Sequence, residues 1–355
     1  MLEFLILLFL STTFAYLAKA KMKYGLEIAF LLITIFAAIR YNYGNDYLNY
    51  LNEFEFHNIH SDKESVVGLR TEFGWFYLIF LFKDLGFYWL VAILTIIEQS
   101  VMYYFIKRYV DKDVYWIAVF VYLITTSLFL SGLSMMRQTL SISLCLIGFE
   151  LSIRRKFIFS LAMVLLASQF HSSALLILPV VLFLYFFYNR INISRSISFA
   201  FLVVIIGASF LSDFISPSLI QSITWIGDTD KYSEYLSVGR NAVFGVSTVV
   251  TYFLIYMVLS NYKYQNVNVK YLMILFLVGC FIESFASSVY LLDRVALYFT
   301  YLMPVCYSMT FKTIKNFSWY PVFIVFFIVL KLYNYNSFVS TGWGQTFRIY
   351  HTIFE

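Results

Sequence analysis

The sequence predicts an all-α polytopic membrane protein with about twelve transmembrane helices, and three observations lead to this fold class. Hydrophobic residues make up 61% of the 355 residues and charged residues only 13%, which is more hydrocarbon than a soluble core needs. Apolar runs of helical length recur along the chain, with the charges gathered in short segments between them. The sequence contains no linker rich in Gly, Ser or Pro, so we expect residues 1–355 to form a single transmembrane domain.

The predicted spans follow from the apolar runs in chain order. Several are shorter than the ~20 residues that a straight crossing requires, which indicates tilted helices or helix ends buried in protein. The first run lacks the basic start and the clean cleavage site of a signal peptide, so we expect a retained helix. The twelve runs are 2–18, 24–39, 86–106, 114–131, 134–151, 157–170, 174–188, 196–211, 243–260, 270–288, 293–311 and 319–333.

A further apolar run at 73–83, FGWFYLIFLFK, is too short for a span, and the positions of the basic residues support this interpretation. If it does not cross, six loops that hold most of the Lys and Arg share one side: KAKMK, KRYVDKD, RRK, NRINISR, NYKYQNVNVK and KTIKN. If it did cross, every basic loop after it would change sides. Since basic loops stay in the cytoplasm, we predict a short re-entrant or interfacial helix at 73–83 and both termini outside the cytoplasm.

With this orientation, three segments long enough to form part of a site lie on the outer side, together with the tip of one helical hairpin. We expect a periplasmic loop at 40–85 that includes the short helix, a second at 212–242, and a periplasmic C-terminal tail at 334–355. Residues 157–188 must form a hairpin of two helices, because basic loops on the same side precede and follow it. Its arms are short against ~30 Å of hydrocarbon, so His171 at the tip should lie below the outer surface.

Two arginines occupy the outer starts of predicted helices. In SGLSMMRQTLSISL, Ser134 is the expected N-cap, which places Arg137 in the first helical turn. A cation there opposes the helix dipole unless an anion binds. In SSVYLLDRVALYF, Asp293 suits a helix start and Arg294 repeats the unfavourable placement. Backbone N–H groups and a guanidinium together suit a phosphate, although each arginine could instead extend its side chain to water.

Three other ionisable residues are candidates on the same side. Histidine is the usual general base for a hydroxyl, so His171 could take such a proton, or it could be a structural histidine bonded to a nearby serine. Arg40 ends the second span and Asp46 lies in the Gly-Asn-Asp turn that follows. They could form the mouth of a cavity, or they could be an interfacial anchor and an ordinary turn. Ionisable groups at membrane depth are functional candidates by default.

Several classes of function lack the residues they need. The sequence has no phosphate-binding Gly-rich loop, no HExxH and no nucleophile elbow, and its three cysteines lie inside apolar runs, where they indicate neither a disulfide framework nor a metal site. The net charge of +5 relates to loop orientation rather than to nucleic acid. We therefore expect no cofactor and no nucleic-acid partner. Glu98 and Glu283 are deeper in spans and could serve a proton pathway in a transporter.

Four segments occur in an order that resembles the EpsG family of bacterial polysaccharide polymerases, the Wzy-like proteins of O-antigen and capsule assembly. These segments are IRYNYGNDYLNY, TEFGWFYLIFLFKDLG, the stretch from SMMRQTLS to FHSSALLILP, and DRVALYF. The block from RQ to FHSSAL is the most specific of them. Residues 196–270 and the tail match in hydropathy only.

This resemblance implies a GT-C-like polymerase bundle in the bacterial inner membrane, with its active site on the periplasmic side. Such an enzyme would be a metal-independent glycosyltransferase that moves a glycan from undecaprenyl diphosphate to a hydroxyl of another lipid-linked repeat unit. The motif positions single out Arg40, Asp46, Arg137, His171 and Arg294 as site residues. Our own hypothesis for their roles is that Arg137 and Arg294, together with Arg40, bind the leaving diphosphate, and that His171 or Asp46 serves as the base for the acceptor hydroxyl. The implied partners are the undecaprenyl-diphosphate-linked oligosaccharide and the lipid bilayer, with a chain-length regulator as a further partner.

A flippase for lipid-linked oligosaccharides, or another glycan transporter, is the main alternative, because it also has about twelve spans and a basic cavity. It would be expected to show two related halves and charges deep in several helices, whereas the charges here favour the outer rim. A membrane O-acyltransferase would need polar catalytic residues near the cytoplasmic face. The sequence has only short basic loops there.

Overall fold

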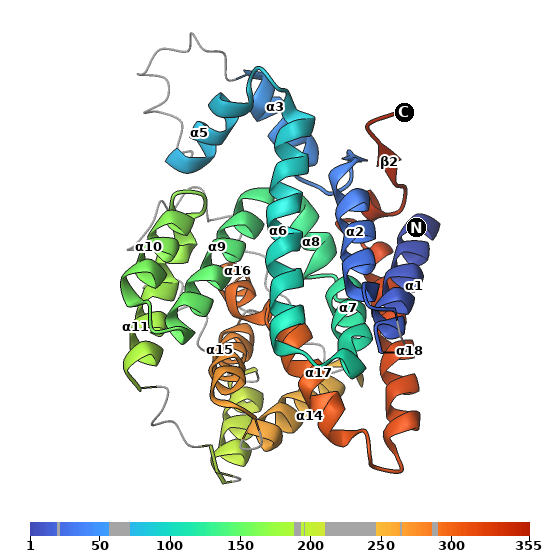
Figure 1. The fold of residues 1–355 in the computed structure, drawn as a ribbon, viewed down its shortest axis with the longest axis vertical. Coiled ribbons are helices and arrows are strands. Elements are labelled where there is room, and N and C mark those ends of the chain that lie inside the picture. Colours follow the sequence, from blue (N-terminus) through green and yellow to red (C-terminus); the bar gives the residue numbers. More distant parts are fainter. Residues whose placement is uncertain are drawn as a thin grey trace.

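A computed structural model describes residues 1–19, 22–56, 72–187, 193–194, 196–209, 246–262, 265–285 and 290–355. Nearly all regular structure in these ranges is α-helical, which confirms the predicted helical class. In Figure 1 the helices α2, α6, α9, α10 and α18 run along the long axis, while α3 and α5 lie at one end. We call this the outer end.

The first half of the chain contains the helices α1 (Leu2–Leu17), α2 (Gly25–Ala38), α3 (Tyr47–Phe56), α5 (Phe73–Phe82), α6 (Phe87–Tyr109), η1 (Lys112–Val114), α7 (Tyr115–Ile124), α8 (Phe129–Ser134) and α9 (Met136–Ile153). The second half contains α10 (Phe157–Ser168), η2 (Ser172–Ile177), α11 (Leu178–Phe187), a helix at Ser196–Ser209, α14 (Val246–Asn261), α15 (Val267–Glu283), α16 (Tyr290–Thr300), α17 (Met303–Ile314), α18 (Tyr320–Val339) and η5 (Gly344–Phe347). The short strands β1 (Arg40–Tyr41) and β2 (His351–Thr352) pair antiparallel.

Within the described ranges, α6 and α18 are the two helices that are long and apolar enough to cross a membrane on their own. Shorter apolar helices occupy other predicted spans, among them 2–18, 24–39 and 157–170. Helices of this length reach across hydrocarbon only where the bilayer is thinned or where protein surrounds their ends. The fold is therefore that of a helical membrane protein, and the number of twelve spans stays a prediction.

Two predicted spans are each divided into two helices. The span at 114–131 consists of α7 and α8, and the span at 293–311 consists of α16 and α17. The two breaks meet, because the Tyr301 hydroxyl donates a hydrogen bond of 2.8 Å to the Leu128 carbonyl. A Cβ at Gly132 would lie only 2.6 Å from that hydroxyl. The Leu128 carbonyl also accepts a hydrogen bond of 3.0 Å from the Gly132 N–H of its own helix, so the Tyr301 hydroxyl adds a second bond that joins the two breaks.

Ion pairs join two of the basic loops that we predicted for one side to segments that are distant in sequence. Lys107, at the end of α6, binds Glu27, at the start of α2, with 2.7 Å between nitrogen and oxygen. Lys312 of α17 binds Asp111, which follows α6, at 2.5 Å. These ion pairs join loops that are distant in sequence, which is the arrangement expected when the helices alternate in direction.

The C-terminal tail, predicted at 334–355, begins inside α18 and then folds over the outer end. Its strand β2 pairs with β1, and the Trp343 carbonyl accepts a hydrogen bond of 2.9 Å from Nδ2 of Asn45. Figure 1 shows the C-terminus at the end of the bundle where α2 ends and the chain continues into β1. The tail therefore supports the turn that carries Asp46. The predicted loop at 212–242 lies outside the described residues.

Candidate active site

The short helix α5 is docked on the tip of the hairpin formed by α10 and η2. The Gly74 N–H donates a hydrogen bond of 2.9 Å to the Gln169 carbonyl. A Cβ at Gly74 would lie 2.9 Å from atoms of Gln169, so only glycine allows this approach. Figure 1 shows α5 above α10 at the outer end. The contact brings the N-terminus of α5 next to His171, the residue that immediately precedes η2.

Glu72, the residue before α5, connects two of the predicted site residues. Its Oε2 lies 3.1 Å from Nη1 of Arg137, and its Oε1 lies 3.3 Å from Nδ1 of His171. The Ser172 N–H donates to the same Oε1 at 3.3 Å. The three ionisable side chains are partly accessible, with 18% to 28% of each exposed. Residues from three separate segments thus meet at one carboxylate.

The surroundings keep Glu72 ionised. Burial would by itself raise the pKa of this carboxyl, but the interaction with His171 and the charge of Arg137 outweigh it, so the pKa lies below the ordinary value. A carboxylate at Nδ1 fixes the orientation of an imidazole and directs its Nε2 outward. Histidine bases in other hydrolytic and transfer sites are held in this way. The arrangement therefore suits His171 to accept a proton at Nε2.

Arg137 lies in the first turn of α9, as predicted, although the N-cap position is Met135 and not Ser134. Its guanidinium carbon is 5.5 Å from the centre of the Tyr50 ring of α3. One edge of the guanidinium binds Glu72, so the cation is held by an aromatic face and by a carboxylate. A diphosphate could replace or join that carboxylate, because both present oxygen pairs to the planar donors.

Ser134 binds Asp46 instead of capping α9. Its hydroxyl accepts a 3.1 Å hydrogen bond from the Asp46 N–H and lies 3.4 Å from Oδ2. The turn approaches closely because Gly44 has a φ of +121°, and a Cβ there would lie 3.0 Å from Ser134. Burial raises the pKa of Asp46, against the opposing charges of Arg294 and Arg137. Asp46 is thus within electrostatic range of both arginines.

Arg294 is the fifth residue of α16, which begins at Tyr290, so it lies beside α9 but one turn beyond the helix start where we predicted it. The Gln138 side chain donates a hydrogen bond of 2.8 Å to the Arg294 carbonyl, which fixes the two helix starts relative to each other. Together with the electrostatic influence on Asp46, this contact places Arg294 in the cluster that contains Arg137. Four predicted site residues therefore gather at the outer end.

Arg40 lies apart from this cluster and is only 2% exposed. Its Nη1 donates to the carbonyl of Ala37 and, at 3.0 Å, to Oγ1 of Thr95. Its Nη2 donates to the Leu133 carbonyl at 3.3 Å. These bonds join the ends of α2 and α8 to α6. The contacts of Arg40 are those of a residue that holds helices together.

Sequence reasoning missed Glu72, which the structure makes the centre of the cluster. A signal was present, because an acidic residue directly before an apolar helix is a typical N-terminal residue. Its pairing with Arg137 and His171 depends on how α5 docks, which no local pattern indicates.

The described residues contain no group of three or more His, Cys, Asp or Glu that could hold a metal ion.

A sequence model of the EpsG family matches residues 23–350, nearly the whole chain. The matched range includes all five predicted site residues and Glu72. Neither the curated proteins nor the solved structures include a match to the chain.

Proposed function

The chain belongs to the EpsG family, and from this premise we propose that it is a polysaccharide polymerase of the inner membrane. Family membership associates it with glycosyltransferase-type polymerisation in polysaccharide biosynthesis. The proposed reaction transfers a glycan from undecaprenyl diphosphate to a hydroxyl of another lipid-linked repeat unit at the periplasmic face. The product is the O-antigen or a capsular polysaccharide.

One observation carries the proposal: Glu72 joins Arg137 to His171 at the outer end, next to Asp46 and Arg294. Transfer from a glycosyl diphosphate needs a cationic site for the leaving group and a base for the acceptor. In the cluster, Arg137 is such a cation and His171 is such a base, and both contact the carboxylate of Glu72. Its partial exposure leaves room for a substrate to approach.

In the proposed reaction, Nε2 of His171 takes the proton of the acceptor hydroxyl. The resulting oxygen forms a bond to the anomeric carbon of the donor glycan, and the bond from that carbon to the diphosphate oxygen breaks. The electron pair leaves with the diphosphate, whose growing charge Arg137 and Arg294 stabilise. His171 suits the base better than Asp46, because Glu72 orients the imidazole whereas Ser134 holds the aspartate.

The donor supplies the free energy of the reaction, because the bond between sugar and diphosphate is already activated. We therefore propose a metal-independent reaction in which arginines neutralise the diphosphate. The bilayer holds both lipid-linked substrates, and a chain-length regulator is a proposed further partner. For Arg40 we propose a supporting role, since it anchors the segment that leads to Asp46.

Deletion of the gene tests the reaction class when surface polysaccharide is separated on a gel. A polymerase mutant should leave lipid A–core with a single repeat unit, while loss of a flippase would leave core without any repeat. Persistence of long chains would refute the polymerase. Restoration of the ladder by the wild-type gene, and not by His171→Ala at equal protein level, would connect the activity to the cluster.

A further inference from the structure

A chain of three hydroxyl groups connects four helical elements near the candidate active site. Tyr298 of α16 is fully buried, and its hydroxyl oxygen lies 3.0 Å from Oγ of Ser141 in α9. The same oxygen lies 3.2 Å from Oγ of Ser173 in η2. The Ser141 hydroxyl in turn donates a hydrogen bond of 3.0 Å to the carbonyl of Ala167, near the end of α10. One tyrosine therefore joins segments that are distant in sequence.

The hydrogens of this chain can point in one direction only. A hydroxyl group has a single hydrogen to donate, and its oxygen can also accept. The Ser141 hydrogen is used on a carbonyl, which only accepts, so the Tyr298 hydroxyl must donate to Ser141. The Tyr298 oxygen then accepts from Ser173. The chain thus runs from η2 through α16 and α9 to α10, and each of its three hydrogens has an acceptor.

Two of the hydroxyls lie one helical turn beyond the arginines of the site. Ser141 is four residues after Arg137 in α9, and Tyr298 is four residues after Arg294 in α16. Residues four apart lie on the same face of a helix, roughly 6 Å from each other along its axis. The bond between Tyr298 and Ser141 therefore fixes the two helices to each other directly below the two cations.

The two ends of the chain hold the backbone around His171. The His171 N–H donates a hydrogen bond of 3.1 Å to the same Ala167 carbonyl that the Ser141 hydroxyl binds. Ser173, at the other end of the chain, is the second residue after His171 and belongs to η2. The histidine is thus carried on a turn that is bonded to α9 on one side and to α16 on the other.

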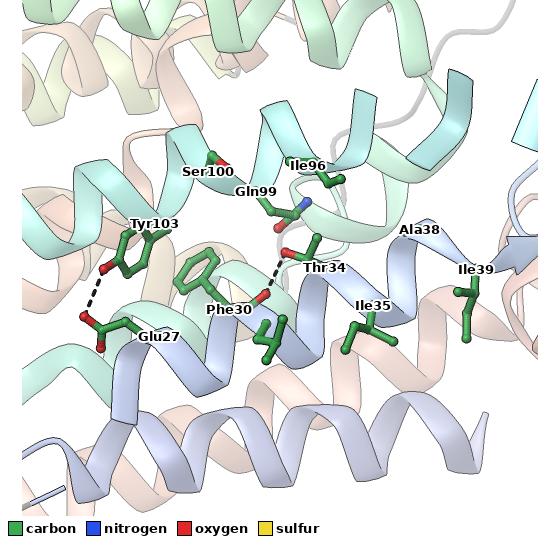
Figure 2. A pocket seen from close by; sticks show the side chains of 11 residues that line it. Glu27, Phe30, Thr34, Ile35, Ala38, Ile39, Ile96, Gln99, Ser100 and Tyr103 are labelled. Carbon is green, nitrogen blue, oxygen red and sulfur yellow. Dashed lines mark hydrogen bonds between the residues drawn. The ribbon is translucent and has the colours of Figure 1, made fainter. Parts of the chain in front are cut away.

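Other tyrosine hydroxyls of the bundle connect pairs of helices. Tyr103 of α6 donates to Oε1 of Glu27 in α2 at 2.9 Å, beside the groove between these two helices (Figure 2). Tyr271 of α15 is fully buried and donates at 2.9 Å to Oγ of Ser152, near the C-terminal end of α9. Tyr298 differs from them because the elements that it joins carry or adjoin the two arginines and the histidine of the site.

We propose that Tyr298 is a positioning residue, an inference that rests on the polymerase function proposed above. Its two hydrogen bonds fix His171 relative to Arg137 and Arg294. In the proposed reaction the base takes the acceptor proton while the arginines stabilise the leaving diphosphate, so the rate depends on the distance between the base and the cations. Because Tyr298 is fully buried, it acts through the groups that it holds and does not contact a substrate.

Tyr298→Phe removes the hydroxyl and keeps the ring, and Tyr271→Phe is the matched control. Both substitutions delete a buried hydroxyl that binds a serine of α9, so both should lower the melting temperature. The assay is polymer formation by the full-length protein in vesicles that contain lipid-linked repeat units. Since small displacements of reacting groups slow catalysis strongly, Tyr298→Phe should lower kcat about tenfold and leave the KM for the acceptor unchanged. Tyr271→Phe should keep the wild-type kcat, and equal kcat values in the two variants would overturn the positioning role.

Ser173→Ala tests the contact with the hairpin by a milder change. It should lower kcat in the wild-type background and have little further effect in Tyr298→Phe, because both substitutions break the same bond. Losses that add independently would refute the coupling.

Hydrogen exchange gives a readout that does not depend on activity. Backbone exchange in residues 168–177 should be faster in Tyr298→Phe than in Tyr271→Phe. Equal exchange in the two variants would show that this hydroxyl does not hold the hairpin.

The wild-type rate distinguishes a failure of the positioning role from a failure of the proposed function. If the wild-type protein forms no polymer from lipid-linked units, the proposed function is refuted and the positioning role falls with it. If the wild type forms polymer and Tyr298→Phe has the wild-type kcat, the function stands and the positioning role alone is refuted.

Discussion

Replacement of Glu72 by glutamine should slow chain elongation about 30-fold, and the expectation follows from the two contacts of its carboxylate. Glutamine keeps the shape of the side chain and removes its charge. The carboxylate lies 3.1 Å from Arg137 and 3.3 Å from His171, and these side chains are less than one third exposed. Charge-assisted hydrogen bonds of this kind contribute about 1.5–3 kcal/mol. A loss of about 2 kcal/mol in the transition state corresponds to about 30-fold in rate.

The assay is the initial rate of polymer formation by purified protein in vesicles, with lipid-linked repeat units as both substrates. Because Glu72 positions His171 and does not itself contact the acceptor, the loss should fall on kcat and not on the KM for the acceptor. Glu55→Gln is the matched control, since Glu55 is an exposed carboxylate of α3 at the same end. A wild-type rate in Glu72→Gln, or an equal loss in Glu55→Gln, would refute the positioning role.

Three further predictions test the site. Arg137→Lys should retain more of the polysaccharide ladder than Arg137→Ala, because lysine keeps the charge but loses the planar donors; equal ladders would exclude the diphosphate role. Arg40→Ala should lower the free energy of unfolding by about 3 kcal/mol, since it leaves buried carbonyls without donors, whereas Arg137→Ala should lower it less, because the Arg137 side chain is partly exposed. The pKa of Glu72 is lowered by folding, so its carboxylate stabilises the protein above about pH 4.5, and this contribution is lost as the pH falls through the folded value. The melting temperature of wild type minus that of Glu72→Gln should therefore be constant near neutral pH and shrink in acid.

The helical class and the side of the bundle on which the site residues lie could be predicted, because both depend on hydropathy and charge averaged over whole segments. Hydropathy and loop charge are properties of whole segments, and they placed His171 and Arg137 on one side of the bundle, where the structure has them share Glu72. No pattern within one segment could show Glu72 between them. That contact depends on the fit of Gly74 against Gln169, which is a tertiary property.

The breaks within two predicted spans illustrate a second limit. The first break falls at the polar residues 125–127 and the second lies directly before Pro304, but the residues on both sides are apolar, so hydropathy averaged over a whole segment does not show either break. The break is stable because Tyr301 of one helix pair bonds the Leu128 carbonyl of the other. Arg40 is a similar case: its position at a helix end suggested a cation at the mouth of a cavity or an interfacial anchor, but carbonyls of α2 and α8 and a threonine of α6 bind it. Such pairings become visible only when the helices are packed.

The pairing of β1 with β2 imposes an order on biogenesis. Arg40 pairs with Thr352, and Asn45 binds the carbonyl of Trp343, so the turn that carries Asp46 is synthesised about 300 residues before its support. Chains fold progressively from the N-terminus during synthesis. The support of the Asp46 turn is therefore absent until residues 343–352 have been synthesised and α18 has been inserted. A nascent chain that ends before α18 would carry the arginines and the histidine without the support of the Asp46 turn.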